Sequence, residues 1–185
     1  MGREVRRVPP NWKHPETQDN YGRTCLQPMH DETFDERFTE WLADFDRVRA
    51  GNLTDTEREW YPRGLADWLM DEGAPLDPAY YRPWQDDEAT WFQLWETVSE
   101  GTPVSPPFAT KEELAAHLAV HGDAWDQARS AKGRAGFTRG QATGWGMERA
   151  RAFVEAGWAP SMMVINEPGN LSIVESKDIP LAQSS

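Results

Sequence analysis

The chain has 185 residues, which suits one domain, and a formal net charge of −12, which opposes non-specific binding to nucleic acid. Ten tryptophans exclude a disordered chain, and a single cysteine excludes an internal disulfide. Because no apolar stretch approaches the roughly 18 residues of a membrane span and none opens the chain as a secretory signal would, we expect no membrane contact.

The charge is distributed unevenly along the chain. Residues 1–30 carry five basic and three acidic groups, residues 31–126 carry seven and 23, and residues 127–185 carry seven and five. An acidic block of −16 therefore lies between two mildly basic ends. Two interpretations are open: a solvated surface, or a surface that attracts the basic face of a partner protein.

We expect residues 1–30 to form an extended N-terminal arm. Its four prolines remove backbone donors and favour extended conformations. Trp12 and Tyr21 are suited to anchor the arm to a core, and Val5 and Val8 suit a short edge strand. A nucleic-acid contact through the arginines of this segment is the alternative.

Two helical stretches follow. Apolar residues at helical spacing predict an amphipathic helix within residues 31–51, with Thr33 and Glu36 as a capping box. A second stretch, residues 53–73, has the same box at Thr54 and Glu57. Pro62 and Gly64 are expected to break this second stretch in two.

The middle of the chain is less regular. Residues 74–90 contain three prolines and no period, which predicts a long connection. Residues 90–99 are ambiguous between helix and strand, and their aromatic and β-branched content favours a strand. Thr110 and Glu113 form a third capping box, which opens a helix over residues 111–122.

The last third is predicted to contain a loop, a helix and two strands. Residues 128–144, with four glycines and four basic groups, indicate a mobile loop, and residues 146–158 a helix. Strands at residues 161–166 and 171–176 are expected to form a β-hairpin through a turn at Pro168 and Gly169. The fold class is therefore α+β: residues 31–185 form a single compact domain, with helices on a small antiparallel sheet that includes this hairpin.

Histidine and cysteine spacing suggests metal binding only weakly. His117 and His121 lie one helical turn apart, as zinc ligands do, but the glutamate of the metalloprotease motif is missing. Cys25 and His30 make one pair, whereas a closed zinc site needs four ligands. We expect no metal, no other cofactor and no catalytic residue.

Two candidate contact surfaces stand out. Arg134 and Arg139 lie in a glycine-rich segment suited to a phosphate or nucleic-acid contact, although the segment lacks the P-loop pattern. Acidic and aromatic residues of the middle block combine charge with large rings, which suits a protein partner. These are Asp86, Asp87, Glu88, Trp84 and Trp60.

Three segments resemble a family of small acidic proteins encoded by bacteriophages and prophages. They are MGREVRRVPPNWKHP at residues 1–15, LWETVSEGTPVSPPFATKEEL at residues 94–114 and FVEAGWAPSMMV at residues 153–164. The resemblance implies a phage origin and the cytoplasm of an infected bacterial host. It gives no residue a role.

These observations favour a phage-encoded, non-enzymatic accessory protein. It would bind and modulate a host or phage protein through that protein's basic face, with acidic mimicry of nucleic acid as one form. No direct nucleic-acid binding is expected. The alternatives are a structural or assembly component of the virion, and a small enzyme with an unrecognised site.

Overall fold

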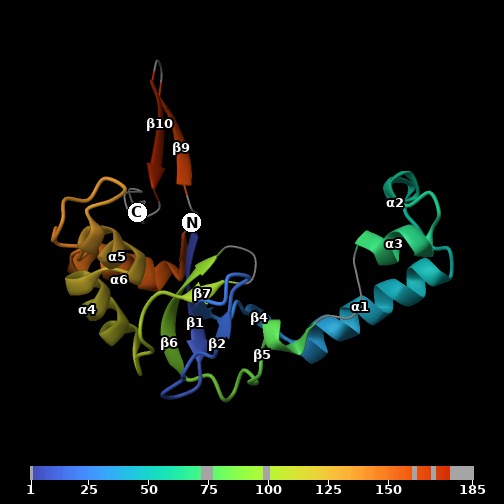
Figure 1. Ribbon diagram of the computed structural model, residues 1–185, viewed down its shortest axis with the longest axis horizontal. Coiled ribbons are helices and arrows are strands. Elements are labelled where there is room, and N and C mark those ends of the chain that lie inside the picture. Colours follow the sequence, from blue (N-terminus) through green and yellow to red (C-terminus); the bar gives the residue numbers. More distant parts are fainter. Residues whose placement is uncertain (1, 72–76, 98–100, 160–161, 168–169, 176–185) are drawn as a thin grey trace. The chain divides into compact units, whose positions relative to one another are not determined.

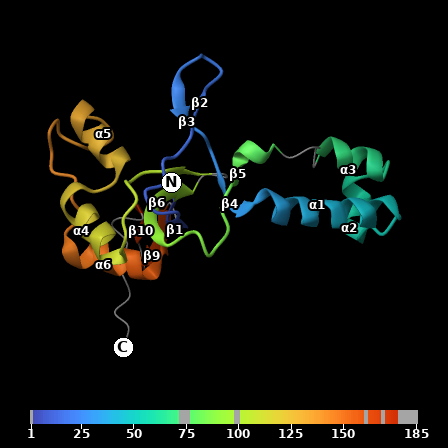
Figure 2. The same cartoon turned by 90° about the horizontal axis from the view of Figure 1, so that it is seen from below.

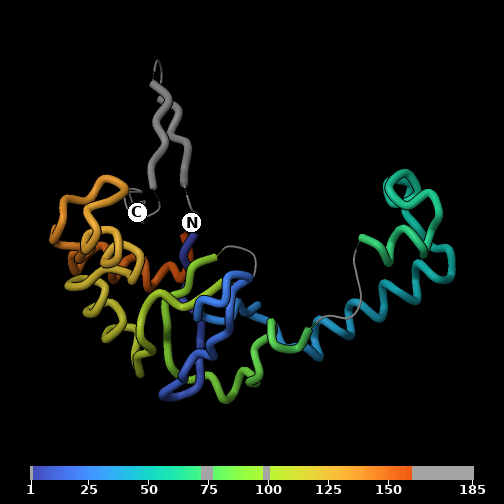
Figure 3. Tube along the Cα trace, viewed as in Figure 1, coloured from blue at the N-terminus to red at the C-terminus, as the bar shows by residue number. Residues whose placement is uncertain are grey.

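The computed structural model describes residues 2–71, 77–97, 101–159, 162–167 and 170–175 (Figure 1). The chain divides into two compact units, Met1–Pro28 with Trp84–Ser185, and Met29–Pro83. We call them the sheet unit and the helical unit. Figure 3 shows the chain leaving the sheet unit after the blue N-terminal segment and returning to it in green. The predicted division into an arm of residues 1–30 and a domain of residues 31–185 does not coincide with these units.

The sheet unit is built on four strands in the order β7-β6-β1-β8. β1 (Gly2–Val8) pairs antiparallel with β6 (Trp91–Thr97) along its whole length, and with β8 (Trp158–Ala159) on its other side. β7 (Thr102–Pro103) completes the order beside β6. The predicted strand at residues 90–99 is therefore confirmed.

The predicted strand at Val5 and Val8 is present, but its predicted place at a sheet edge is wrong, because β1 lies inside the sheet. The prolines begin only at Pro9, so the seven residues of β1 keep every backbone donor that a central strand needs. Its alternating residues bury Val8 on one face and pack Val5 against the helical core on the other.

The described part of the sheet unit contains the helices α4 (Lys111–His121), α5 (Ala124–Lys132) and α6 (Met147–Ala156). The predicted capping box of α4 is confirmed. The predicted loop at residues 128–144 is wrong for its first five residues, which continue α5. Asp123 caps that helix, and Gly133 ends it in the left-handed conformation.

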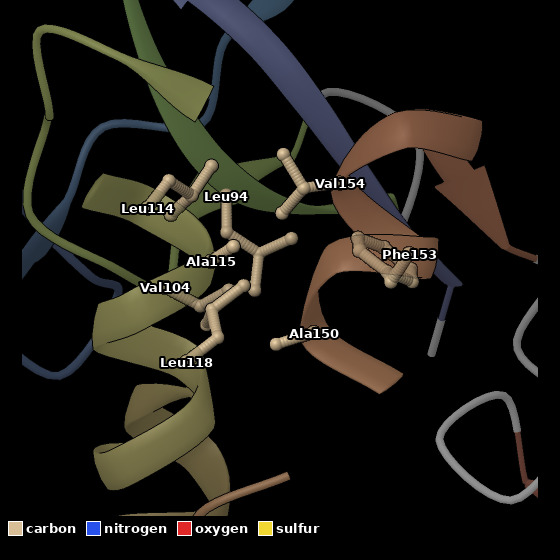
Figure 4. Close-up of a cluster of buried hydrophobic side chains, with 8 residues drawn as sticks. All are labelled: Leu94, Val104, Leu114, Ala115, Leu118, Ala150, Phe153 and Val154. Atoms are coloured by element: carbon tan, nitrogen blue, oxygen red, sulfur yellow. The ribbon is translucent and has the colours of Figure 1, made fainter. Parts of the chain in front are cut away.

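The core of the sheet unit lies between α4, α6 and one face of the sheet. Figure 4 shows side chains of α4 and α6 pointing toward each other and toward Leu94 of β6. The buried cluster consists of Leu94, Val104, Leu114, Ala115, Leu118, Ala150, Phe153 and Val154. Since a buried aliphatic side chain contributes about 1.5–3 kcal/mol, burial of this cluster stabilises the unit substantially.

The opposite face of the sheet is covered by the segment after β1. This segment contains the antiparallel pair β2 (Glu16–Gln18) and β3 (Thr24–Leu26). The ring of Trp12 packs against that of Trp84, with centroids 4.5 Å apart, and His14 meets the buried ring of Trp95 at 4.9 Å. Trp12 therefore anchors the segment after β1, as predicted, whereas Tyr21 is 84% exposed and its predicted role as an anchor is wrong.

The helical unit consists of short strands and helices. β4 (His30–Thr33) pairs in parallel with β5 (Tyr81–Arg82), which follows the 3₁₀ helix η1 (Pro78–Tyr80). Between them lie α1 (Phe34–Arg49), α2 (Asp55–Trp60) and α3 (Leu65–Asp71). In Figures 1 and 2, α3 runs beside the C-terminal part of α1. Both capping boxes and the predicted break between α2 and α3 are confirmed.

Near the C-terminus, β9 (Met162–Glu167) and β10 (Asn170–Glu175) pair antiparallel with each other. They form a sheet apart from the four strands above, whereas the sequence placed them in the main sheet. The predicted turn at Pro168 and Gly169 lies outside the described residues, so the C-terminal hairpin stays a prediction. The α+β class with antiparallel sheets is confirmed.

Candidate protein-binding site

The helical unit carries most of the excess negative charge of the chain. Its 55 residues contain fourteen acidic and six basic side chains, a formal charge of −8. All six basic side chains are arginines that pair with carboxylates of the same unit: Arg37, Arg47, Arg49, Arg58, Arg63 and Arg82. The unit's own cations are thus already engaged, and its surplus of negative charge is left to act on ions and molecules outside it.

One internal network is tight. The guanidinium of Arg47 donates to both carboxylate oxygens of Glu57, at 2.8 and 2.9 Å, and to Asp44. These bonds, with the capping bonds from Thr54, lower the pKa of Glu57 to about 2. Glu57 therefore stays ionised across the physiological range and links α1 to α2.

A row of rings follows one face of α1. Phe34, Phe38, Trp41 and Phe45 are spaced by four, three and four residues, with successive centroids 5.6, 6.0 and 5.4 Å apart. Trp68 of α3 packs on this row, 5.8 Å from Trp41. This row of rings forms much of the packing inside the helical unit. Its contact with Trp68 holds α3 against α1.

The turn between α2 and α3 directs several side chains outward. Pro62 has no backbone N–H and ends α2, and Gly64 takes a φ of +63°, which favours glycine. Trp60 is consequently 68% exposed at the end of α2, and Met70 is 77% exposed on the side of α3 opposite Trp68. Large exposed apolar side chains beside one another are typical of contact surfaces.

These side chains line a shallow hollow of about 670 Å³, which we call the Trp60 hollow. It is lined by Trp60, Tyr61, Pro62, Arg63, Asp67, Met70 and Asp71. Its lining combines one indole, one thioether and two carboxylates in a single depression. Such a lining is suited to a partner side chain with an apolar stem and a positive end.

The carboxylates of the hollow have defined partners. Asp67 accepts a bond of 2.6 Å from Nε of Arg63 and one of 2.7 Å from the Arg63 backbone N–H, and Asp71 accepts the Tyr61 hydroxyl at 2.9 Å. The bonds from the Arg63 side chain, and then that from its backbone, lower the pKa of Asp67. Asp67 is therefore a stable anion at neutral pH.

No protein-family model matches the chain. No curated protein and no solved structure matches it either. The chemistry of its own residues is therefore the basis for a functional assignment.

The predicted partner-binding residues belong to two different units. Trp60 lines the hollow of the helical unit. Asp86, Asp87 and Glu88 are exposed in a turn of the sheet unit, where Glu88 accepts the Gln85 backbone N–H at 2.8 Å. Trp84 is only 4% exposed and packs on Trp12, so it belongs to the interior of the sheet unit.

The predicted phosphate-contact residues lie in the loop after α5. Arg134 and Arg139 are both exposed, and Nε of Arg139 donates to the Ala131 carbonyl at 3.3 Å. Gly140 donates its N–H to Ser130, which fixes the return of the loop. The loop supplies exposed positive charge, and phosphate binding by it stays a prediction.

The histidine and cysteine pairs fall in different settings. His117 and His121 have ring centroids 4.9 Å apart on α4, and burial lowers the pKa of His117. Cys25 is exposed on β3 in the sheet unit, whereas His30 stacks on a tyrosine in the helical unit. Among the described residues no group of three or more His, Cys, Asp or Glu side chains is placed to hold a metal ion.

Six of the seven residues that line the hollow were missed by sequence reasoning: Tyr61, Pro62, Arg63, Asp67, Met70 and Asp71. A signal for Met70 exists. The inward positions of α3 are Leu65, Trp68 and Leu69, so an apolar Met70 falls off that face and must be exposed. The two carboxylates carry no such mark, because acidic residues are common throughout this unit.

A second hollow, of about 330 Å³, lies between α4 and α6. Its charged groups pair across the helices, Arg151 with Glu112 at 2.5 Å and Lys111 with Glu155 at 3.9 Å. The bond from Arg151 lowers the pKa of Glu112, which makes this carboxylate a poor proton acceptor at neutral pH. The ion pairs of this second hollow thus join two helices.

In the part of the chain that the structure describes, no helix is long and apolar enough to cross a bilayer.

Proposed function

We propose that the chain is a non-enzymatic accessory protein whose helical unit binds the basic face of another protein and modulates it. The observation that carries this proposal is the internal pairing of all six arginines of the unit, which leaves a formal surplus of eight negative charges. Like charges on one small unit repel each other and lower its stability, so a function that uses them is the economical explanation.

The Trp60 hollow gives this surface a place for short-range contact. Charge steers two proteins together but contributes less to their final affinity than buried aromatic side chains do. Trp60 and Met70 are the large exposed apolar side chains of the hollow, at 68% and 77% exposure. We therefore place the centre of the interface at this hollow and the remaining acids of the unit around it.

The resemblance to phage proteins supports a partner in the infected bacterial cytoplasm. A host or phage protein that binds nucleic acid has the required basic face, and the acidic unit would then occupy it in place of the phosphate backbone. Occupancy of that face is the proposed mode of modulation.

The test begins with a tagged chain expressed in the bacterial host, and each captured protein is then purified. Its association rate with the chain is measured at about 50 and 300 mM salt, a range over which the Debye length falls from about 14 to 6 Å. We expect the rate to fall steeply with salt. We also expect it to fall when Asp35, Glu40 and Glu59 of the helical unit are replaced together by Asn, Gln and Gln.

The matched control is the triple replacement Asp86→Asn, Asp87→Asn and Glu88→Gln in the sheet unit, which removes the same charge. Under our proposal it slows association less than the replacement in the helical unit. Association that does not respond to salt or to the helical-unit replacement would exclude the proposed function. A larger effect of the sheet-unit replacement would move the interface to Asp86, Asp87 and Glu88.

A further inference from the structure

We infer that the Trp60 hollow takes up an arginine side chain of the partner protein, in the position that Arg63 holds in the free chain. The inference rests on the proposed function, because it names the partner group that this surface recognises. The proposed occupant is the guanidinium of an exposed arginine on a basic protein segment.

The position is marked by an arginine of the chain itself. The guanidinium of Arg63 lies on the Asp67 carboxylate, with an Nη2–oxygen distance of 2.5 Å, and its Nη2 is 3.5 Å from the sulfur of Met70. The hollow thus already accommodates a guanidinium beside a carboxylate and a thioether. When Arg63 is displaced, the guanidinium of a partner's arginine has the same shape and can make the same contacts with the Asp67 carboxylate and the Met70 sulfur.

Exposure shows that the occupant can be exchanged. The side chain of Asp67 is 14% exposed, whereas that of Arg63 is 67% exposed. The carboxylate is therefore held in place, and the guanidinium lies over it from the solvent side. Because the Arg63 side chain of this pair is mostly exposed, the pair contributes little to stability, and displacement of Arg63 has a small cost that a partner's other contacts can offset.

Arginine suits the hollow better than lysine does. Its planar fork offers parallel N–H groups to one carboxylate, and its flat face stacks on an indole such as Trp60. A lysine ammonium is more strongly hydrated and supplies no flat face. Charge complementarity with the surrounding acidic unit selects a basic segment, and the hollow then selects arginine within it.

The experiment uses the full chain and three blocked pentapeptides: Gly-Arg-Leu-Arg-Gly, the same peptide with lysine for arginine, and the same peptide with the neutral isostere citrulline. Binding is followed by NMR through the indole N–H signal of Trp60, assigned with Trp60→Phe. We expect the arginine peptide to bind at least about tenfold more tightly than the citrulline peptide, and several-fold more tightly than the lysine peptide.

The decisive variant is Arg63→Gln, which removes the internal competitor. It should bind the arginine peptide about two- to fivefold more tightly than the unsubstituted chain, the range expected for loss of an exposed competing ion pair. Arg58→Gln is the matched control, because Arg58 pairs with Asp55 at 2.8 Å on α2 and does not line the hollow. It changes the net charge equally and should have a smaller effect. Asp67→Asn should weaken binding.

Equal affinity for arginine and citrulline peptides would overturn the inference, as would weaker binding by Arg63→Gln. The two proposals can fail separately. If partner association depends on salt and on the helical-unit acids but not on Asp67 or Trp60, the proposed function stands and the arginine site falls. If the arginine peptide binds at the hollow while no basic protein associates with the chain, the site stands and the proposed function falls.

Discussion

An almost fully buried ion pair joins the first strand to a helix far along the sequence. Nε of Arg3 on β1 donates to Oδ2 of Asp123 at 2.9 Å, and both side chains are almost fully buried. The other oxygen of Asp123 accepts the Asp126 N–H at 2.8 Å and so caps α5. One carboxylate thus holds a strand and a helix end together.

Replacing Asp123 by Ala should destabilise the protein by about 3–5 kcal/mol, because it removes a carboxylate that bonds the buried Arg3 guanidinium and also removes the cap of α5. Urea unfolding followed by circular dichroism measures the loss. Asp55→Ala removes an exposed partner instead and should cost less than about 1 kcal/mol. If Asp123→Ala and Asp55→Ala lowered the free energy of unfolding equally, burial of the Arg3–Asp123 pair would not be the cause of its contribution to stability.

His14 makes stability depend on pH. Its Nε2 lies 2.6 Å from the Gln27 carbonyl and must donate to it, and its Nδ1 is buried without a hydrogen-bond partner among the described residues. Burial is the main cause that lowers the pKa of His14 below 6.5, and the nearby Arg6 acts in the same direction. The ring is therefore neutral in the folded chain at physiological pH.

The unfolded chain takes up this proton first, so the contribution of His14 to stability is complete above about pH 6.5 and is lost as the pH falls from there toward the lowered folded-state pKa. We predict that His14→Gln reduces the loss of stability between about pH 7.5 and 5.5. Urea unfolding at the two pH values measures it. An unchanged loss in the variant would assign the pH dependence to other groups, such as His117.

At the scale of elements, β1 is the strand on which the sheet unit depends. It is paired on both sides, and Val8 at its end is fully buried. Val8→Asp should cost about 4 kcal/mol or more, because it buries an unpaired charge. Arg7→Gln changes the exposed neighbour and should stay within about 0.5 kcal/mol. Melting temperatures of the two variants test this, and a tolerant Val8→Asp would show that the strand is dispensable.

Helix starts were predictable because their signal is local. The boxes at Thr33, Thr54 and Thr110 each need a Glu three residues later, and each is formed as expected. The place of β1 was not predictable in this way. It depends on a partner strand about 90 residues further along, and the prolines that follow β1 suggested an edge instead.

At the scale of the whole molecule, the two compact units have separate apolar cores. The buried apolar cluster of the helical unit consists of Val48, Tyr61 and Trp68, and Trp68 has the largest side chain of the three. Trp68→Ala should therefore destabilise this unit by about 3–5 kcal/mol. Hydrogen exchange should show loss of protection within Met29–Pro83 and retained protection in β1 and β6. Uniform loss across both units would mean that the chain unfolds as one.

The candidate site was only partly predictable, because contacts between residues far apart in the sequence decide which side chains are exposed. Trp60 and Trp84 look alike in the sequence, since both are followed or preceded by proline and acidic residues. Their fates differ because Trp12, 72 positions earlier, covers Trp84, whereas nothing described covers most of Trp60. Composition marks a surface as acidic, but tertiary contacts decide which rings stay on it.

The insertion of the helical unit between β1 and β6 sets an order of events during synthesis. Residues 29–83 are translated before Trp91–Thr97, so the ribosome releases a complete helical unit while β1 still lacks its long antiparallel neighbour. Translation adds about 5–20 residues per second, so the backbone N–H and C=O groups of β1 stay unpaired with β6 for several seconds. Nascent chains stalled at the point where residue 83 has left the ribosome and Trp91–Thr97 have not should thus be the species most dependent on chaperones.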